Sequence, residues 1–172
     1  MSRHLAQSFR DSGKCDHNGE YTIFGQIHKK YKKSEEFVSG FRRNGVDQMA
    51  FKTFFEGEGS DDWGGPFRET LANMVEELES DVLPLLIKTS NHRNEHGSYK
   101  DCFIPNPCAT SPSHETMFKL MGSLLGFNLR TKSSLDWHFP PLFWKMLLEE
   151  PLSLGDFEDS DTYSYQMLRE IR

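Results

Sequence analysis

The residues that could perform chemistry include a glycine-rich acidic stretch, FEGEGSDDWGGPFRETL, which runs from Phe55 to Leu71. A loop of this kind could cradle a phosphate, but its glycines do not follow the G-x-G-x-x-G pattern and its carboxylates would repel an anion. It could also hold calcium, but the alternation and the closing glutamate of an EF-hand loop are absent. We therefore expect a tight turn into a helix, which Asp61 or Asp62 caps.

Two histidines at the spacing H-x-x-E-H, His92 and His96, match one arrangement that zinc peptidases use. Both imidazoles must then lie on one helical face, so that their nitrogens converge on one ion. The flanking sequences, TSN before and GSY after, favour a loop instead. We therefore predict no metal site, and a zinc peptidase stays a minor alternative.

Three cysteines, Cys15, Cys102 and Cys108, are the candidate nucleophiles. Their odd number and their spacing are typical of thiols in a reducing compartment rather than of a disulfide framework. Cys108 stands among prolines without an obvious base, and no G-x-S-x-G elbow occurs. A pair that a cysteine and a histidine form only in space stays open, but the sequence predicts no catalytic residue and no cofactor.

Composition and charge restrict the class of protein. The 172 residues fit one ordinary domain, and 14 Phe and three Trp can fill a core. Residues 1–55 hold ten of the 20 Lys and Arg but six of the 26 Asp and Glu, so the remainder is acidic, which argues against nucleic-acid binding. The longest apolar run, Val82–Ile87, is too short to cross a bilayer and no secretory signal is visible. We expect a soluble cytoplasmic protein without a membrane partner, and a nuclear location stays open.

The elements that must position these residues follow from hydrophobic periodicity. The clearest helix is predicted by a single apolar stripe that begins after Pro66. Pro84 excludes a central strand from the segment VLPLLI. We expect a flexible lead-in over 1–20 and a domain over 21–172. In order, the expected elements of this domain are a helix over 23–31, a short strand over 49–55, a helix over 66–78, an edge strand or irregular segment over 82–87, a loop over 88–98 and a short strand over 101–104.

The rest of the chain is expected to be helical. A helix from Ser111 to about Arg130 is apolar around nearly its whole circumference, which indicates burial in the middle of a domain. Gly122 and Gly126 lie four residues apart on it and would let another element approach closely. Further helices are expected to begin at Pro140, Ser153 and Asp161. Helical spacing continues to the last residue, so we interpret the chain as cut within its architecture. The predicted fold is α+β and predominantly helical, with a few short strands.

Three ordered motifs resemble the start of the HECT domain of ubiquitin-protein ligases. The first lies in FEGEGSDDWGGPFRE, the second in NPCATSPSHETMFKLMGSLLGFNLR, and the third runs from LDWHFPPLFWKMLL to PLSLGDFEDSDTYSYQML. The segment LRTKSSLD is similar to the large-chain, HERC-like branch, whereas Asn128 stands where a small apolar residue is usual. The motif positions, which the resemblance implies to be structural, are Gly57, Glu58, Asp61, Gly64, Gly65, Arg68, Glu69, Asn106, Pro107, Phe118, Gly122, Gly126, Phe139, Pro140, Lys145, Asp156 and Asp161.

The resemblance implies a partial HECT N-lobe, its large subdomain. In this family a cysteine of the C-terminal lobe takes ubiquitin from a conjugating enzyme as a thioester and passes it to a substrate lysine. None of the three cysteines here lies at that position, so the resemblance implies a scaffold that is inert alone. Its partners would be the remainder of the HECT domain and, through the missing subdomains, the conjugating enzyme and ubiquitin. The alternative is a non-catalytic interaction module, suggested by the basic run Lys29–Lys33 and an acidic cluster over 149–161.

Overall fold

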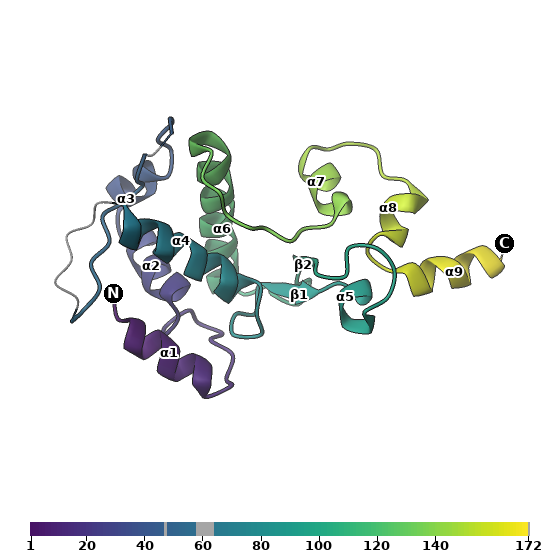
Figure 1. The fold of residues 1–172 in the computed structure, drawn as a ribbon, viewed down its shortest axis with the longest axis horizontal. Helices are drawn as coiled ribbons and strands as arrows, with labels where there is room; N and C mark the ends of the chain where they lie inside the picture. Colours follow the sequence, from purple (N-terminus) through teal and green to yellow (C-terminus); the bar gives the residue numbers. More distant parts are fainter. Residues whose placement is uncertain (47, 58–63, 172) are drawn as a thin grey trace. The chain divides into compact units, whose positions relative to one another are not determined.

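A computed structural model describes residues 1–46, 48–57 and 64–171 (Figure 1). These residues form a mostly helical structure with a two-stranded antiparallel sheet, so the predicted fold class is confirmed. The chain divides into two compact units, Met1–Leu85 with Pro107–Asp136, and Leu86–Asn106 with Trp137–Arg172. None of the described helices is long and apolar enough to span a membrane.

The first unit is helical, and α4 and α6 supply much of its core. Its elements are α1 (Arg3–Asp11), α2 (Ile23–Tyr31), α3 (Glu35–Gly40), α4 (Gly65–Leu78) and α6 (Pro112–Thr131). The apolar stripe predicted for α4 is buried from Phe67 to Leu78. Phe127 of α6 presents its ring edge-on to Phe41 and Phe67, with centroid distances of 6.1 and 5.9 Å. Interlocking aromatic rings therefore fill the centre of this unit.

The second unit holds the sheet and the shorter helices. Its elements are β1 (Leu86–Lys88), α5 (Ser90–Asn94), β2 (Phe103–Pro105), α7 (Pro141–Leu147), α8 (Leu154–Glu158) and α9 (Thr162–Glu170). The strands pair antiparallel with Ile87 opposite Ile104. Ser153 and Asp161 cap α8 and α9 as predicted, because each side chain accepts the backbone N–H three residues further along.

The first residues differ from the expected flexible lead-in, because they form α1 and contact the rest of the unit. Ser2 caps the helix, and the Met1 amine donates to the carbonyl of Phe54 at 2.6 Å. The Arg3 guanidinium lies 3.6 Å from the centre of the Phe55 ring. Polar, cation–π and ring-stacking contacts hold this helix, whose fully buried residue is Ala6.

The strand expected at Met49–Phe55 is not formed, since residues 48–57 contain no strand. The segment still alternates, with Thr53 and Phe55 buried and Phe54 exposed. The Phe51 ring packs on rings of α3 and α4 instead, with centroids 4.9 and 5.1 Å away. A strand needs a neighbouring strand for its backbone hydrogen bonds, and this segment lies against helices.

Two further expectations need correction. Residues 88–98, expected as a loop, contain the end of β1 and all of α5, a helix too short to show periodicity. A Cβ added at Gly122 would meet no atom within 4 Å, and the nearest atoms to one at Gly126 belong to the flexible guanidinium of Arg130. The two glycines therefore do not provide the close approach of another element that their spacing suggested.

Candidate functional site

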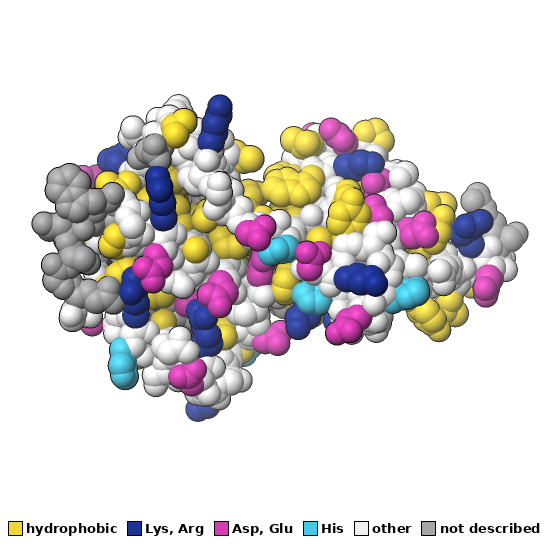
Figure 2. Space-filling view, viewed as in Figure 1, with side chains coloured by type: hydrophobic (Ala, Val, Ile, Leu, Met, Phe, Trp, Pro, Cys, Tyr) yellow, Lys and Arg dark blue, Asp and Glu magenta, His cyan; other side chains and the backbone are white. Residues whose placement is uncertain are grey.

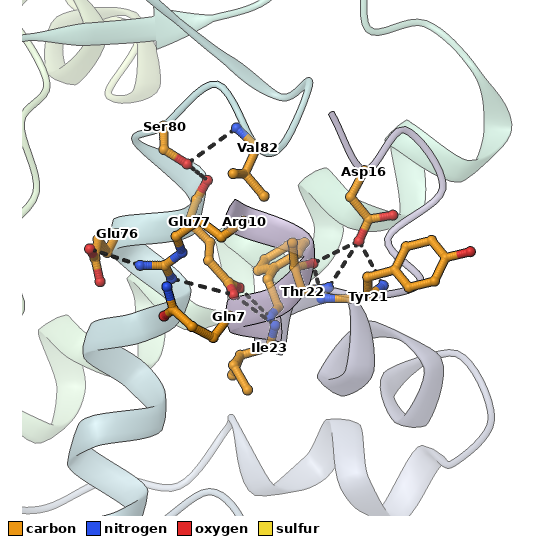
Figure 3. A network of polar contacts seen from close by, with 12 residues as sticks. Gln7, Arg10, Asp16, Tyr21, Thr22, Ile23, Glu76, Glu77, Ser80 and Val82 are labelled. Carbon is orange, nitrogen blue, oxygen red and sulfur yellow. Dashed lines mark hydrogen bonds and ion pairs between the residues drawn. The ribbon is translucent and has the colours of Figure 1, made fainter. Parts of the chain in front are cut away.

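A polar network surrounds Glu77 of α4, whose side chain is buried (Figure 3). Its carboxylate oxygens accept the backbone N–H groups of Ile23 and Phe24 at 2.8 and 2.7 Å. These are the first two amides of α2, which have no partner within their own helix. From α1, Arg10 places Nη2 3.7 Å from Glu77 Oε1, and its Nη1 donates to Glu76 at 3.0 Å. Glu77 therefore connects α1, α2 and α4.

Asp16 fixes the loop that leads into α2 (Figure 3). Its buried carboxylate accepts the backbone N–H groups of Glu20, Tyr21 and Thr22 at 2.8–3.0 Å, and the Thr22 hydroxyl as well. Burial raises the pKa of the Glu77 carboxyl to about 7, and the charge of Asp16 adds to that rise, while the two amides and Arg10 oppose it. Asp16 lies in a polar segment and Glu77 lies beside the apolar stripe of α4, and the sequence analysis predicted neither role.

The glycine-rich stretch is described at its two ends. Gly57 has a φ of 84° and Gly64 a φ of 101°, conformations that favour glycine. Gly64 is the N-cap residue of α4, and its left-handed backbone makes the predicted sharp turn into this helix, while the predicted caps Asp61 and Asp62 lie outside the described residues. The positions of the stretch that lie outside the described residues include Glu58, Asp61 and Asp62.

A pocket of about 780 Å³ in the first unit lies beside this turn. Its lining includes the motif positions Gly64, Arg68 and Glu69, and the segment 131–135 that follows α6. Glu69 also pairs with Arg3 of α1, so one wall of the pocket is tied to the N-terminal helix. The walls mix aromatic, charged and hydroxyl groups, a composition that does not define one class of ligand.

In the second unit, two motif positions form an ion pair. Lys145 Nζ of α7 lies 2.7 Å from Asp156 Oδ1 of α8. The other carboxylate oxygen accepts the backbone N–H and the hydroxyl of Ser153, each at 2.7 Å, which completes a capping box. Lys145, with help from Ser153, holds the pKa of Asp156 at about 2. One carboxylate therefore begins α8 and binds α7 to it.

The other motif positions also have structural surroundings. Phe139 stacks on Phe143 with centroids 4.0 Å apart, and the buried Pro140 is the N-cap residue of α7. The rest are Gly65 at the start of α4, Asn106 and Pro107 after β2, Phe118 on α6, and the cap Asp161. Among these positions, Phe139 packs against another ring, and Pro140 and Asp161 begin helices.

Sequence reasoning missed Asn91, a buried residue of α5. Its Nδ2 lies 3.0–3.1 Å from the carbonyl oxygens of Ser98, Glu158 and Asp159. Its Oδ1 accepts the backbone N–H of Thr162 at 2.8 Å. Asn91 therefore joins α5 to the start of α9, although an asparagine within a polar segment carries no sequence signal of burial.

The cysteines are not arranged as nucleophiles. Cys15 Sγ lies 3.9 Å from His17 Nδ1, but the contact is exposed. Burial, followed by two nearby aspartates, raises the pKa of the Cys15 thiol, whereas a nucleophilic cysteine needs a lowered one. Cys102 is buried and Cys108 lies at the surface. The raised pKa of Cys15 and the burial of Cys102 are not typical of a catalytic thiol.

The histidines of the H-x-x-E-H segment are not on one helical face. His92 lies in α5, but this helix ends at Asn94 and Glu95 has a left-handed φ of 51°, so His96 lies beyond it. The His92 ring packs edge-on against Phe103, with centroids 4.9 Å apart. Within residues 1–46, 48–57 and 64–171, no group of three or more His, Cys, Asp or Glu side chains could hold a metal ion.

Comparison with known proteins assigns the class. A family model described as HECT-domain (ubiquitin-transferase) matches residues 72–172, more than half of the chain, so the chain belongs to the HECT-domain family. It is similar to the E3 ubiquitin-protein ligase HERC2 of Homo sapiens, with 34% identity over 159 residues, which are 91% of this chain and 3% of that protein. HERC2 of Mus musculus gives the same identity and coverage. The E3 ubiquitin-protein ligase RSP5 of Chaetomium thermophilum is 27% identical over 86% of this chain and 18% of its own length.

These matches confirm the family that the motifs indicated, and the similarity to HERC2 agrees with the HERC-like resemblance of the segment LRTKSSLD. The motif at Gly57–Glu69 precedes the region that the family model matches. The chain spans a small part of the length of these relatives.

Proposed function

We propose that this chain is the scaffold portion of a HECT-type ubiquitin-protein ligase, the large subdomain of its N-lobe. The observation that carries the proposal is the family match over 72–172, together with the structural roles of the motif residues inside it. The ion pair between Lys145 and Asp156 is the clearest of these roles. The parent protein would accept ubiquitin on a cysteine and transfer it to a lysine, in the cytoplasm or the nucleus.

On this proposal the chain contacts the conjugating enzyme and ubiquitin only through other parts of the parent, and alone it transfers no ubiquitin. The environments of the cysteines support this, because the pKa of Cys15 is raised and Cys102 is buried. The large subdomain would hold the reacting lobes of the parent protein in a fixed geometry.

Incubation of the chain with activating enzyme, charged conjugating enzyme and ubiquitin is expected to give no ubiquitin adduct that a reducing agent removes. A complete HECT ligase serves as the positive control. An adduct that Cys108→Ser abolishes, or one that maps to either of the other cysteines, would refute the proposal. Cys108 is the informative position because it lies at the surface.

A second candidate is a non-catalytic interaction module. The exposed apolar side chains of α9 favour it: Tyr163, Met167, Leu168 and, at its end, Ile171. Figure 2 shows hydrophobic side chains on the surface around α7 and beside α9. Asp156 and Asp161 of the acidic cluster are occupied by an ion pair and a helix cap, and Glu158 and Asp159 are half-buried, so Glu149 and Glu150 are its most exposed carboxylates.

For this module we expect the double variant Glu149→Lys/Glu150→Lys to lose the partners that the unchanged chain captures. The matched double variant Lys32→Glu/Lys33→Glu reverses two exposed charges of the first unit and tests the basic run in the same assay. Capture of the same partners by both variants would remove the basis of the charge-driven module.

A further inference from the structure

The contacts of Glu77 make the docking of α1 depend on a buried charge. A carboxylate removed from water is stable only if hydrogen bonds and an opposite charge compensate it. Two amides of α2 supply the hydrogen bonds, and Arg10 of α1 supplies the positive charge, with Nη2 3.7 Å from Oε1. The compensating cation therefore comes from a different helix, one that carries little apolar burial of its own.

The charged groups that face Glu77 come from each neighbouring element. Arg10 comes from α1 and Asp16 from the loop between α1 and α2, while the exposed Glu76 of α4 pairs with Nη1 of the same arginine (Figure 3). The start of α2 presents backbone amides. His28, further along α2, stays neutral near pH 7, because burial and then Lys32 lower its pKa to about 4. Arg10 is thus the stabilising charge among the described groups around this carboxylate.

We propose that α1 is a proton-sensitive clasp, which binds α4 more tightly when Glu77 loses its proton and Arg10 can pair with it. The protonated acid carries no charge for Arg10 to compensate. It also turns one oxygen into an O–H donor, which can no longer accept an amide of α2 as well as the carboxylate does. The geometry therefore links the protonation of one buried side chain to the contacts of the N-terminal helix.

The direction of the effect follows from linkage. The proposal takes Glu77 to stay enclosed between α4 and the α2 amides that it accepts when α1 is released, so that the loss of Arg10 is the main change. Because Arg10 lowers the pKa of Glu77, that pKa is then lower when α1 is docked than when it is released. The docked state therefore binds the proton more weakly, and docking becomes more favourable as the pH rises through the region around 7, to which burial brings this carboxyl. A difference of roughly one pKa unit between the two states would change the docking equilibrium up to about tenfold.

Hydrogen exchange read by mass spectrometry tests the clasp on the whole chain. We expect the protection factors of the α1 amides, corrected for intrinsic exchange, to rise up to about tenfold from pH 6 to pH 8, relative to those of α6. In Glu77→Gln this rise should disappear, because the side chain no longer titrates. Arg10→Met keeps the carboxylate and should also flatten the profile, so it decides the question if Glu77→Gln does not fold.

Glu76→Gln is the matched control. It removes the exposed neighbour to which the same arginine donates and leaves the buried carboxylate in place, so the rise with pH should persist. The proposal is overturned if Arg10→Met keeps the full rise of the unchanged chain, or if Glu76→Gln alone abolishes it, since the exposed ion pair would then carry the effect.

Discussion

Phe127→Ala is expected to lower the free energy of unfolding by about 3–5 kcal/mol, because it removes a large buried ring and leaves a cavity. The ring is fully buried and lies edge-on to the rings of Phe41 and Phe67. These neighbours come from the C-cap of α3 and the first turn of α4, so they cannot close the cavity without moving helices. Urea unfolding followed by circular dichroism gives the difference, provided that the slope with denaturant is unchanged.

Leu129→Ala provides the matched control on the same helix. Leu129 lies two residues further along α6 with 65% of its surface exposed, and alanine favours a helix at least as well as leucine does. We expect its effect to stay within about 0.5 kcal/mol. Equal losses for the two variants would mean that α6 does not bury the face described above.

The helices that the sequence predicted are those with an apolar stripe or a strong boundary residue. α4 and α6 have both, since each has a proline in its first turn and buries regularly spaced apolar residues. The caps Ser153 and Asp161 likewise mark α8 and α9. These signals are local, and a reader of the sequence can evaluate them without knowing which segments meet in space.

The features that the sequence did not reveal depend on contacts between distant segments. Glu77 accepts amides from residues more than fifty positions earlier, and Asn91 contacts Thr162, 71 positions later. Nothing in the type or spacing of either residue distinguishes it from a solvated one. The expected strand at Met49–Phe55 failed for a related reason, because its alternation faces helices and no strand among the described residues pairs with it.

The family motifs occupy a middle position between these two cases. Their residue types led to the correct family, but not to the partners that each residue has. Lys145 and Asp156 were known only as two positions of one motif, and their geometry shows why the types matter: one pair binds α7 to α8 and completes a helix cap. Gly122 shows the opposite outcome, since a side chain at this position would meet no atom within 4 Å and the packing does not require a glycine there.

Gly25→Ala is expected to destabilise the first unit by about 1–3 kcal/mol, because the new methyl group would collide with backbone atoms of Gly19. The loop that holds Gly19 cannot easily yield, since Asp16 accepts three of its backbone N–H groups. A flexible side chain could rotate away from such a collision, whereas the hydrogen bonds to Asp16 restrain this backbone. Thermal or urea unfolding measures the loss.

Gly122→Ala is the matched control, and it should act in the opposite direction. It places the same methyl group within a helix, but no atom lies within 4 Å of the added Cβ. The higher helix propensity of alanine should then raise the free energy of unfolding by about 0.5–1 kcal/mol. A higher free energy of unfolding for Gly25→Ala would contradict the close packing of α2 against the loop that Asp16 holds. A loss for Gly122→Ala as large as that for Gly25→Ala would contradict the open surroundings of Gly122 on α6.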